Sequence, residues 1–171
     1  MIKIQIVLAL FCTVMCQSFA NSVPHEQCFI DASKKYNVPK EILITVASVE
    51  SKFNKNAINY NKNGTYDLGI MQINSRWFDK LSIIGIDEKM LKNPCQNIMI
   101  GAWVMAQKIS AYGFNWVAIQ RYNGSDTQLK YAQKIRDKLE KSYPQLFESG
   151  NVFVKSKTEN KEEKSTMLYV N

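Results

Sequence analysis

The segment "VASVESKFNKNAINYNKNGTYDLGIMQIN", residues 46–74, constrains the fold more than any other part of the chain. It begins in an apolar, helix-type run that reaches Glu50, and its centre carries Asn63-Gly64, a dipeptide typical of a tight β-hairpin turn. Strand-like residues flank this turn on both sides, and Asp67 lies in the second of these runs. The segment therefore predicts a helix followed by a hairpin, with one carboxylate on each element.

Helical periodicity dominates the rest of the chain. Pro39 suits a first helical turn, and in the helix that follows Leu43, Ala47 and Glu50 fall on one face. Further helical patterns cover residues 28–36, 87–93, 94–112, 115–122 and 127–143. Gly113 is expected to end the longest of these helices. We predict an α+β domain, mainly α-helical, whose one small β-hairpin folds over the Glu50 helix and forms a cleft wall.

The two ends of the chain differ from this domain. Residues 1–20 hold one charge, an apolar run and a final "SFA", the pattern of a cleavable signal peptide. The alternative, a transmembrane anchor, needs about 20 apolar residues, more than this run has. The domain is then 21–144, and residues 145–171 are expected to form a disordered charged tail because they lack apolar periodicity. We expect an exported, periplasmic monomer without stable membrane insertion.

Export bears on the cysteines and on the charge. Cys28 and Cys95 remain after signal cleavage, so we expect one disulfide between them, the alternative being two buried free thiols. The formal net charge of +7 indicates an anionic partner, such as a cell-wall polymer or a membrane surface. Nucleic acid is not expected as a partner of an exported protein.

Carboxylates are the best candidates for chemistry. The one histidine, His25, precedes the first expected helix, which leaves little material for a His-dependent triad or zinc site, and no Walker-type loop is present. We expect no metal or cofactor. An acid at an apolar helix end such as Glu50 has a raised pKa and suits a general acid, while a second carboxylate such as Asp67 stabilises positive charge or acts as nucleophile. The alternatives are a solvated helix end and a polar hairpin residue.

The residues around both acids carry a resemblance. The runs "ESKFN" and "AINYNKNGTYDLGIMQINSRWF" resemble the active-site segment of animal lysozymes. That resemblance implies a lysozyme-like fold, with Glu50 as the catalytic acid and Asp67 as the second carboxylate. Animal lysozymes themselves are rich in disulfides, unlike this chain.

A second resemblance covers residues 28–143. Five features in order resemble soluble-type lytic transglycosylases, particularly the small exported ones of type III and type IV secretion, conjugation and pilus systems. These features are Cys28, Glu50-Ser51, Gly69-Ile70-Met71-Gln72, Pro94-Cys95 and "QRYNGS". The family implies cleavage of the β-1,4 bond between N-acetylmuramic acid and N-acetylglucosamine in peptidoglycan, with 1,6-anhydro-muramoyl ends, to open the wall for such a machine. A hydrolysing muramidase and a non-catalytic wall-binding assembly protein remain the alternatives.

The same resemblance supplies candidate contacts with the glycan. The expected substrate-binding residues are Ser51, Gly69, Met71, Gln72, Tyr122 and Asn123. Ser51 would orient Glu50 or water, Met71 would line the wall, and Gly69 would allow close approach of the substrate. Arg121 departs from the family, which has Ala before the Tyr, and this leaves the cleft contacts there open. Each of the three tryptophans is a candidate for stacking on sugar but fits the core as well.

Overall fold

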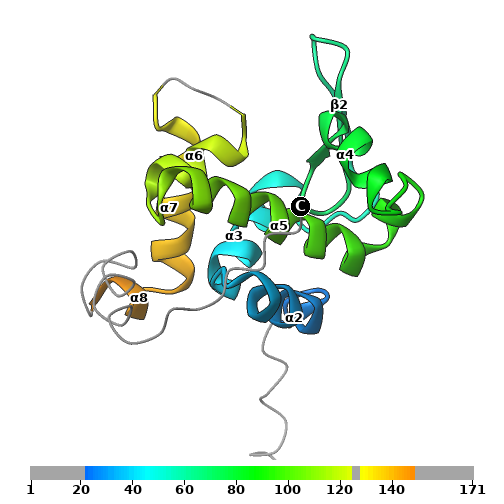
Figure 1. Ribbon diagram of the computed structural model, residues 1–171. Helices are drawn as coiled ribbons and strands as arrows, with labels where there is room; N and C mark the ends of the chain where they lie inside the picture. Colours follow the sequence, from blue (N-terminus) through cyan, green and yellow to red (C-terminus); the bar gives the residue numbers. More distant parts are fainter. Residues whose placement is uncertain (1–21, 125–127, 149–171) are drawn as a thin grey trace, which may run out of the picture.

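A long helix, α5 (Pro94–Tyr112), is the element around which the others are arranged (Figure 1). The structure is a computed structural model and describes residues 22–124 and 128–148. α5 contacts α2, α3, α6 and the third strand. The remaining described helices are α2 (Glu26–Tyr36), α3 (Lys40–Glu50), α4 (Phe78–Ile83), α6 (Trp116–Tyr122), α7 (Lys130–Ser142) and α8 (Gln145–Glu148).

Local sequence signals explain where α5 begins and ends. The side chain of Asn93 accepts hydrogen bonds from the backbone N–H groups of Cys95 and Gln96, and Pro94 occupies the first turn, where it has no N–H to satisfy. The helix ends before Gly113, whose φ of 79° suits glycine, as predicted. Asn115 then caps α6 in the same way as Asn93 caps α5. These caps fix the entry and exit of both helices.

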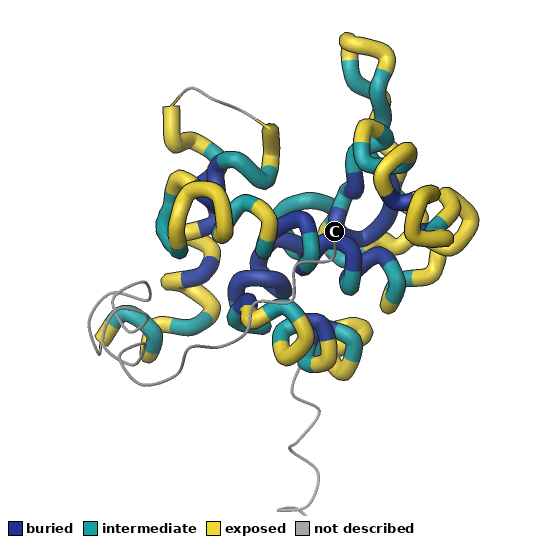
Figure 2. Tube along the Cα trace, in the orientation of Figure 1, coloured by how far each residue is buried: buried dark blue, intermediate teal, exposed yellow. Residues whose placement is uncertain are grey.

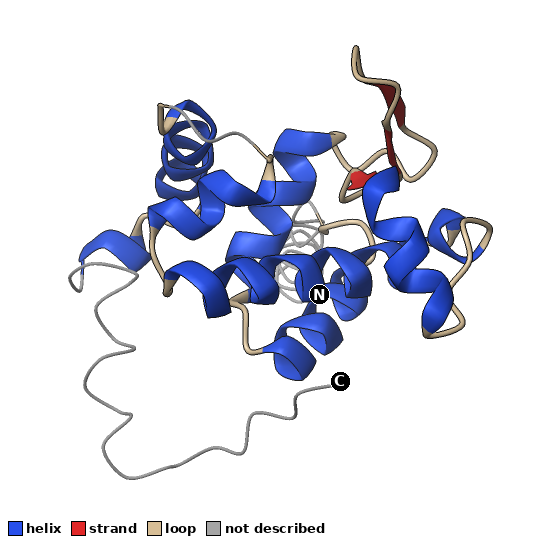
Figure 3. Ribbon diagram, turned by 45° about the horizontal axis from the view of Figure 1, so that its top comes forward, coloured by secondary structure: helices blue, strands red, loops and turns tan. Residues whose placement is uncertain are grey.

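The predicted hairpin is present and gains a third strand. β1 (Ile58–Tyr60) pairs antiparallel with β2 (Tyr66–Leu68), which pairs antiparallel with β3 (Ile73–Asn74), in the order β1-β2-β3. Gly64 turns the chain between the first two strands with φ of 81°. Figure 3 shows the strands gathered at one end of a mainly helical molecule. This arrangement confirms the predicted α+β class and carries Asp67 on the middle strand.

The hydrophobic core lies between α2, α3, α5 and α7. α3 is buried over most of its length, including Leu43 and Ala47 on the predicted apolar face. Figure 2 shows the buried segments in the helical body, whereas the tip of the hairpin is exposed. Glu50, the last residue of α3, therefore lies at the edge of the core, next to the sheet.

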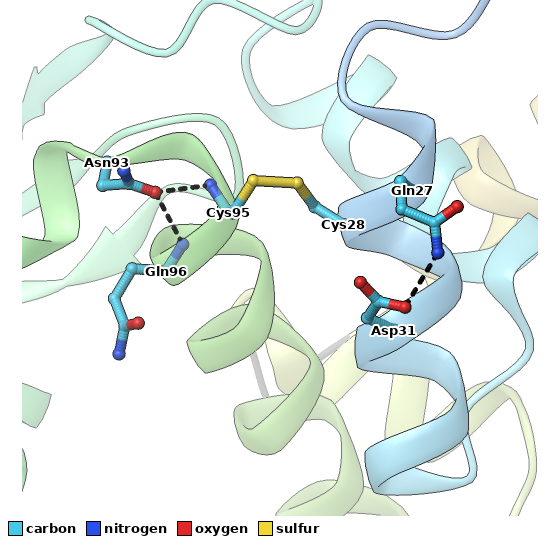
Figure 4. Close-up of a disulfide and its surroundings, with 6 residues drawn as sticks. All are labelled: Gln27, Cys28, Asp31, Asn93, Cys95 and Gln96. Atoms are coloured by element: carbon cyan, nitrogen blue, oxygen red, sulfur yellow. Dashed lines mark hydrogen bonds between the residues drawn. A yellow bond between two sulfur atoms is a disulfide. The ribbon is translucent and has the colours of Figure 1, made fainter.

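One disulfide links the first described helix to the start of α5. Cys28 on α2 is bonded to Cys95 on α5, with Cα atoms 5.1 Å apart (Figure 4), as predicted. The bond closes a loop over a sequence separation of 67, and loop-closure entropy makes such a link worth about 4 kcal/mol. It joins α5 to α2 beside the cap formed by Asn93.

The structure differs from the expected organisation in three segments. α4 was not predicted, and the short helix expected at residues 87–93 is a 3₁₀ turn, η2 (Met90–Lys92), because Pro94 follows it closely. Residues 145–148, expected to begin a disordered tail, form α8 instead, because Leu146 and Phe147 pack against the core. The expected signal peptide, residues 1–20, and the rest of the tail, residues 149–171, lie outside the described residues. Within the described ranges, no helix is long and apolar enough to cross a bilayer.

Candidate active site

A cleft of about 770 Å³ opens between the end of α3, the sheet, α5 and α6. This volume suits a ligand of several rings. The lining includes both predicted acids, together with Gln72, Tyr122 and Asn123. The structure thus brings five of the eight predicted catalytic and substrate-binding residues to one cavity. The other three, which are Ser51, Gly69 and Met71, do not line it.

Glu50 sits at the cleft edge of the core and is largely removed from water. Its Oε1 accepts a hydrogen bond of 2.5 Å from the hydroxyl of Tyr131 on α7. Burial raises the pKa of Glu50 from 4.5 to about 7, against the lowering effect of the Tyr131 bond; the charge of Asp67 raises it further and that of Lys134 lowers it. A carboxyl with this pKa holds its proton in about half of the molecules at neutral pH, as a general acid requires.

Asp67 is held by amides instead of by burial. Its Oδ2 accepts a hydrogen bond of 2.9 Å from Asn61 Nδ2, and its Oδ1 accepts one of 2.7 Å from Asn74 Nδ2. Both amides also donate to the hydroxyl of Thr65, so the group forms one network across the sheet. The network fixes the carboxylate in one orientation at the cleft wall. The sequence had placed Asp67 on this wall but had not identified its two amide donors.

Tyr122 and Gln72 connect the cleft to the chain behind it. The hydroxyl of Tyr122 donates to the carbonyl of Met71 at 2.8 Å, and burial raises the pKa of Tyr122 well above its usual value, with the charge of Glu50 adding to the effect. Gln72 adopts φ of 51°, and its side-chain nitrogen donates to the carbonyls of Gly69 at 2.8 Å and Ala57 at 3.3 Å. Both side chains therefore brace the floor of the cleft as well as line it.

Ser51, Gly69 and Met71 make their contacts behind the cleft lining. The hydroxyl of Ser51 donates to the carbonyl of Ile70 at 2.8 Å, so it ties the end of α3 to the turn between β2 and β3. Met71 is fully buried and does not line the cleft. A Cβ on Gly69 would lie 2.3 Å from Nδ2 of Asn97, so the close neighbour that requires glycine is a protein side chain, not the substrate.

Asn97 on α5 is a positioning residue that the sequence did not reveal. Its side chain is fully buried; Nδ2 donates to the carbonyls of Leu68 and Leu91, and Oδ1 accepts from the N–H of Met71. These bonds attach the turn that follows β2 to α5. The one available signal was an amide directly before the apolar run at residues 98–106.

The cleft is also rich in cations. Lys62, Arg76, Lys108 and Arg121 line it alongside the two acids, and Trp77 is the one tryptophan of the three among the lining residues. The guanidinium of Arg121 lies 5.1 Å from the ring centre of Tyr112. The substitution that departs from the family motif therefore adds a positive charge to the cleft. Among residues 22–124 and 128–148, no group of three or more His, Cys, Asp or Glu side chains is placed to hold a metal ion.

Comparisons with known proteins agree with this geometry. The model of the family described as "Transglycosylase SLT domain" matches residues 27–144. The chain is 38% identical over 115 residues to invasion protein IagB of Salmonella typhi, covering 63% of this chain and 72% of IagB. It is 37% identical over 123 residues to protein IpgF of Shigella flexneri, covering 66% of this chain and 81% of IpgF.

A solved structure shows the same fold. An inactive mutant of the lytic transglycosylase Slt from Pseudomonas aeruginosa superposes with a TM-score of 0.58 at 18% sequence identity. The match covers 71% of this chain but 24% of that longer chain.

The fold and the cleft, with an acid of raised pKa facing a carboxylate on the sheet, define a lysozyme-like protein of the class that cleaves glycans. The chain belongs to the transglycosylase SLT family, as the motifs in its sequence predicted. It is accordingly a peptidoglycan lytic transglycosylase.

Proposed function

We propose that Glu50 is the general acid that cleaves the β-1,4 bond between N-acetylmuramic acid and N-acetylglucosamine. The observation that carries this proposal is a carboxyl at the cleft with a pKa raised to about 7 by burial. Its proton passes to the oxygen that leaves with N-acetylglucosamine, and positive charge develops on the muramoyl ring. The carboxylate of Asp67, oriented by its two amides, stabilises that charge across the cleft.

The muramoyl cation is captured by its own 6-hydroxyl. The new bond joins O6 to C1, and the hydroxyl proton returns to the Glu50 carboxylate, which restores the acid. The product carries a 1,6-anhydro-muramoyl end. Water can attack in place of the 6-hydroxyl and leave a reducing end, and the amide-held Asp67 is the feature that favours this alternative, since the hairpin resembles that of lysozymes.

The reaction takes place on the peptidoglycan wall, in the compartment to which the protein is exported. A periplasmic location agrees with the signal-like residues 1–20, and a monomer agrees with one self-contained cleft. Local opening of the wall for a secretion, conjugation or pilus apparatus agrees with relatives such as the invasion protein IagB. The partner within such a machine would contact the enzyme outside the cleft.

Digestion of purified peptidoglycan tests the proposal. Mass spectrometry of the products separates anhydro ends, reducing ends and no cleavage, the last being the outcome for a non-catalytic wall-binding protein. Glu50→Gln should nearly abolish turnover, because an amide cannot donate the proton. Glu140→Gln, a change of the same kind at an exposed site on α7, is the matched control. Substantial turnover by Glu50→Gln would remove Glu50 from the mechanism.

The Asp67 part of the proposal has its own measurement. Asp67→Asn should lower the steady-state rate on peptidoglycan by about tenfold to a hundredfold, or about 1.4 to 2.7 kcal/mol of barrier. The amide keeps the size of the side chain but removes its charge. A rate equal to that of the unmodified enzyme would show that Asp67 takes no part in catalysis.

A further inference from the structure

A row of two tryptophan rings with a lysine at each end runs along one side of the cleft and beyond it. Lys108 Nζ on α5 lies 5.5 Å from the ring centre of Trp77, which closes the 3₁₀ turn η1 (Ser75–Trp77). The ring of Trp77 meets that of Trp103 on α5 edge to face, with centres 5.2 Å apart. Lys80 Nζ on α4 lies 5.3 Å from the ring centre of Trp103. We call these four residues the Lys–Trp row.

The row begins inside the cleft and leaves it. Trp77 and Lys108 are lining residues of the cleft, whereas Trp103 and Lys80 are not. Contact between the two rings makes the outer pair continuous with the inner pair. A polymer bound in the cleft would therefore meet the outer pair once it extends past the reacting sugars. The family motifs in the sequence do not include Lys80 or Trp103.

The tryptophan rings hold the two ammonium groups in place. A lysine side chain normally loses considerable conformational freedom when it binds a ligand. A cation–π contact restricts the side chain in advance, so less freedom is lost on binding. Since each ring already has an ammonium group near it, the rings act as supports for charge more than as free surfaces for stacking sugar.

Within the described ranges, neither lysine of the row forms a salt bridge. The salt bridge found there joins Lys40 to Glu26, on other helices. Arg76, exposed in η1 and also part of the cleft lining, adds a further cation next to Trp77. A surface that holds several cations in restrained positions, with neither lysine of the row in a salt bridge within the described ranges, fits an anion with several separate charges, such as a series of carboxylates.

We propose that the Lys–Trp row is an accessory binding site for the stem-peptide carboxylates of a peptidoglycan strand. This inference rests on the proposed function and narrows its substrate class to peptide-bearing strands. In such strands the lactyl carboxyl of N-acetylmuramic acid is used up in the bond to the peptide, so the free carboxylates belong to the stem. Stem peptides extend away from the sugar chain, and the outer pair, Lys80 and Trp103, lies outside the cleft.

The test measures binding in the Glu50→Gln protein, so that the ligand is not consumed. The probes are peptide-bearing glycan oligomers, the same oligomers after an amidase has removed the peptides, and neutral chitooligosaccharides of equal length. Lys80→Gln should raise the Kd for the peptide-bearing probe by about two- to fivefold, and the double change with Lys108→Gln by about five- to twentyfold. The Kd of Lys80→Gln for the neutral probe should not change.

Matched variants separate a specific site from general charge. Lys35 on α2 lies over the ring of Tyr36 at 5.4 Å, away from the cleft, so Lys35→Gln removes a lysine held in the same way and should leave every Kd unchanged. Lys80→Arg keeps both the charge and the ring contact and should retain the affinity. Raising the salt concentration should shrink the difference in Kd for the peptide-bearing probe between the protein with Lys80 and the Lys80→Gln variant, because exposed charges are screened.

Two outcomes would overturn the inference. A Kd for the peptide-bearing probe that rises no more in Lys80→Gln than in Lys35→Gln would remove the accessory site. A loss confined to the peptide-free glycan would assign the row to the lactyl carboxylate instead of the stem peptide. Either result can occur while the unmodified enzyme still releases normal products from peptidoglycan, so the proposed function would stand. Absence of any product from the unmodified enzyme would instead overturn the proposed function.

Discussion

Replacing Tyr131 with phenylalanine should change the pH dependence of the enzyme in a defined direction. The Tyr131 hydroxyl donates a hydrogen bond to Glu50 and thereby opposes the rise in pKa caused by burial. Tyr131→Phe removes that bond and leaves the buried carboxyl in place. The pKa of Glu50 should therefore rise above its present value of about 7.

The size of the rise follows from the strength of the bond. A hydrogen bond to a charged group contributes about 1.5 to 3 kcal/mol, and 1.36 kcal/mol corresponds to one pH unit. Because the protonated carboxyl also keeps part of the bond, the lower end applies, and the pKa should move by about one pH unit. At its optimum the variant should be slower by about tenfold, because the carboxyl loses the contact that positions it.

The assay is kcat/KM on soluble glycan strands between pH 5 and 9, which reports the pKa of the free enzyme. Activity should fall with a midpoint near pH 7 in the unmodified enzyme and near pH 8 in Tyr131→Phe. Tyr122→Phe is the control, since it also loses a buried hydroxyl, but one that bonds to the carbonyl of Met71. A midpoint that stays at its original pH in Tyr131→Phe, or moves to lower pH, would refute this account of Glu50.

Three further predictions concern stability. The pKa of Glu50 is raised on folding, so its contribution to stability is fully present below pH 4.5 and is lost as pH rises through about 7. In urea unfolding at pH 8, Glu50→Gln should therefore be more stable than the unmodified protein by up to about 3 kcal/mol, and at pH 4.5 it should be no more stable. Gly69→Ala should lower the free energy of unfolding in urea by more than about 2 kcal/mol. Gly64→Ala, where φ is similarly positive but nothing lies within 4 Å of the added Cβ, should lower it by about 1 kcal/mol, and equal losses in the two variants would contradict the clash with Asn97. Thiol titration of the denatured, non-reduced protein should find Cys28 and Cys95 unreactive, and replacing both by serine should lower the free energy of unfolding by about 4 kcal/mol, while two reactive thiols would exclude the bond.

Local sequence carried the prediction of the acids and of the hairpin. Glu50 ends a helix whose apolar face is visible in the spacing of its residues, and the Asn63-Gly64 turn fixes the hairpin that presents Asp67. The two acids reach the cleft from elements that follow one another directly along the chain, and α5 and α6 complete the lining. For such neighbours, secondary structure and the order of elements are sufficient to place two side chains on facing walls.

Contacts between distant segments could not be predicted in the same way. Tyr131 is 81 positions from Glu50, and its spacing with Ile135 and Leu139 on α7 made it resemble an ordinary core residue. Gly69 and Met71 were misplaced for a different reason. The backbone turns sharply at Gly69 and again at Gln72, both with positive φ, so neighbours within one motif point to opposite sides of the cleft floor. Periodicity carries no information across such turns.

The three hydrogen bonds of Asn97 determine how the wall that carries Asp67 can move. They attach the base of the sheet to α5, whereas the tip of the hairpin at residues 62–64, beyond the Asn61 amide that holds Asp67, is exposed. Opening of the base requires loss of a buried amide network, so it belongs to the same cooperative unit as the helical core. The tip can bend without that loss. A glycan strand can therefore be admitted by flexing of the tip alone, while the distance between the two acids stays set by the core.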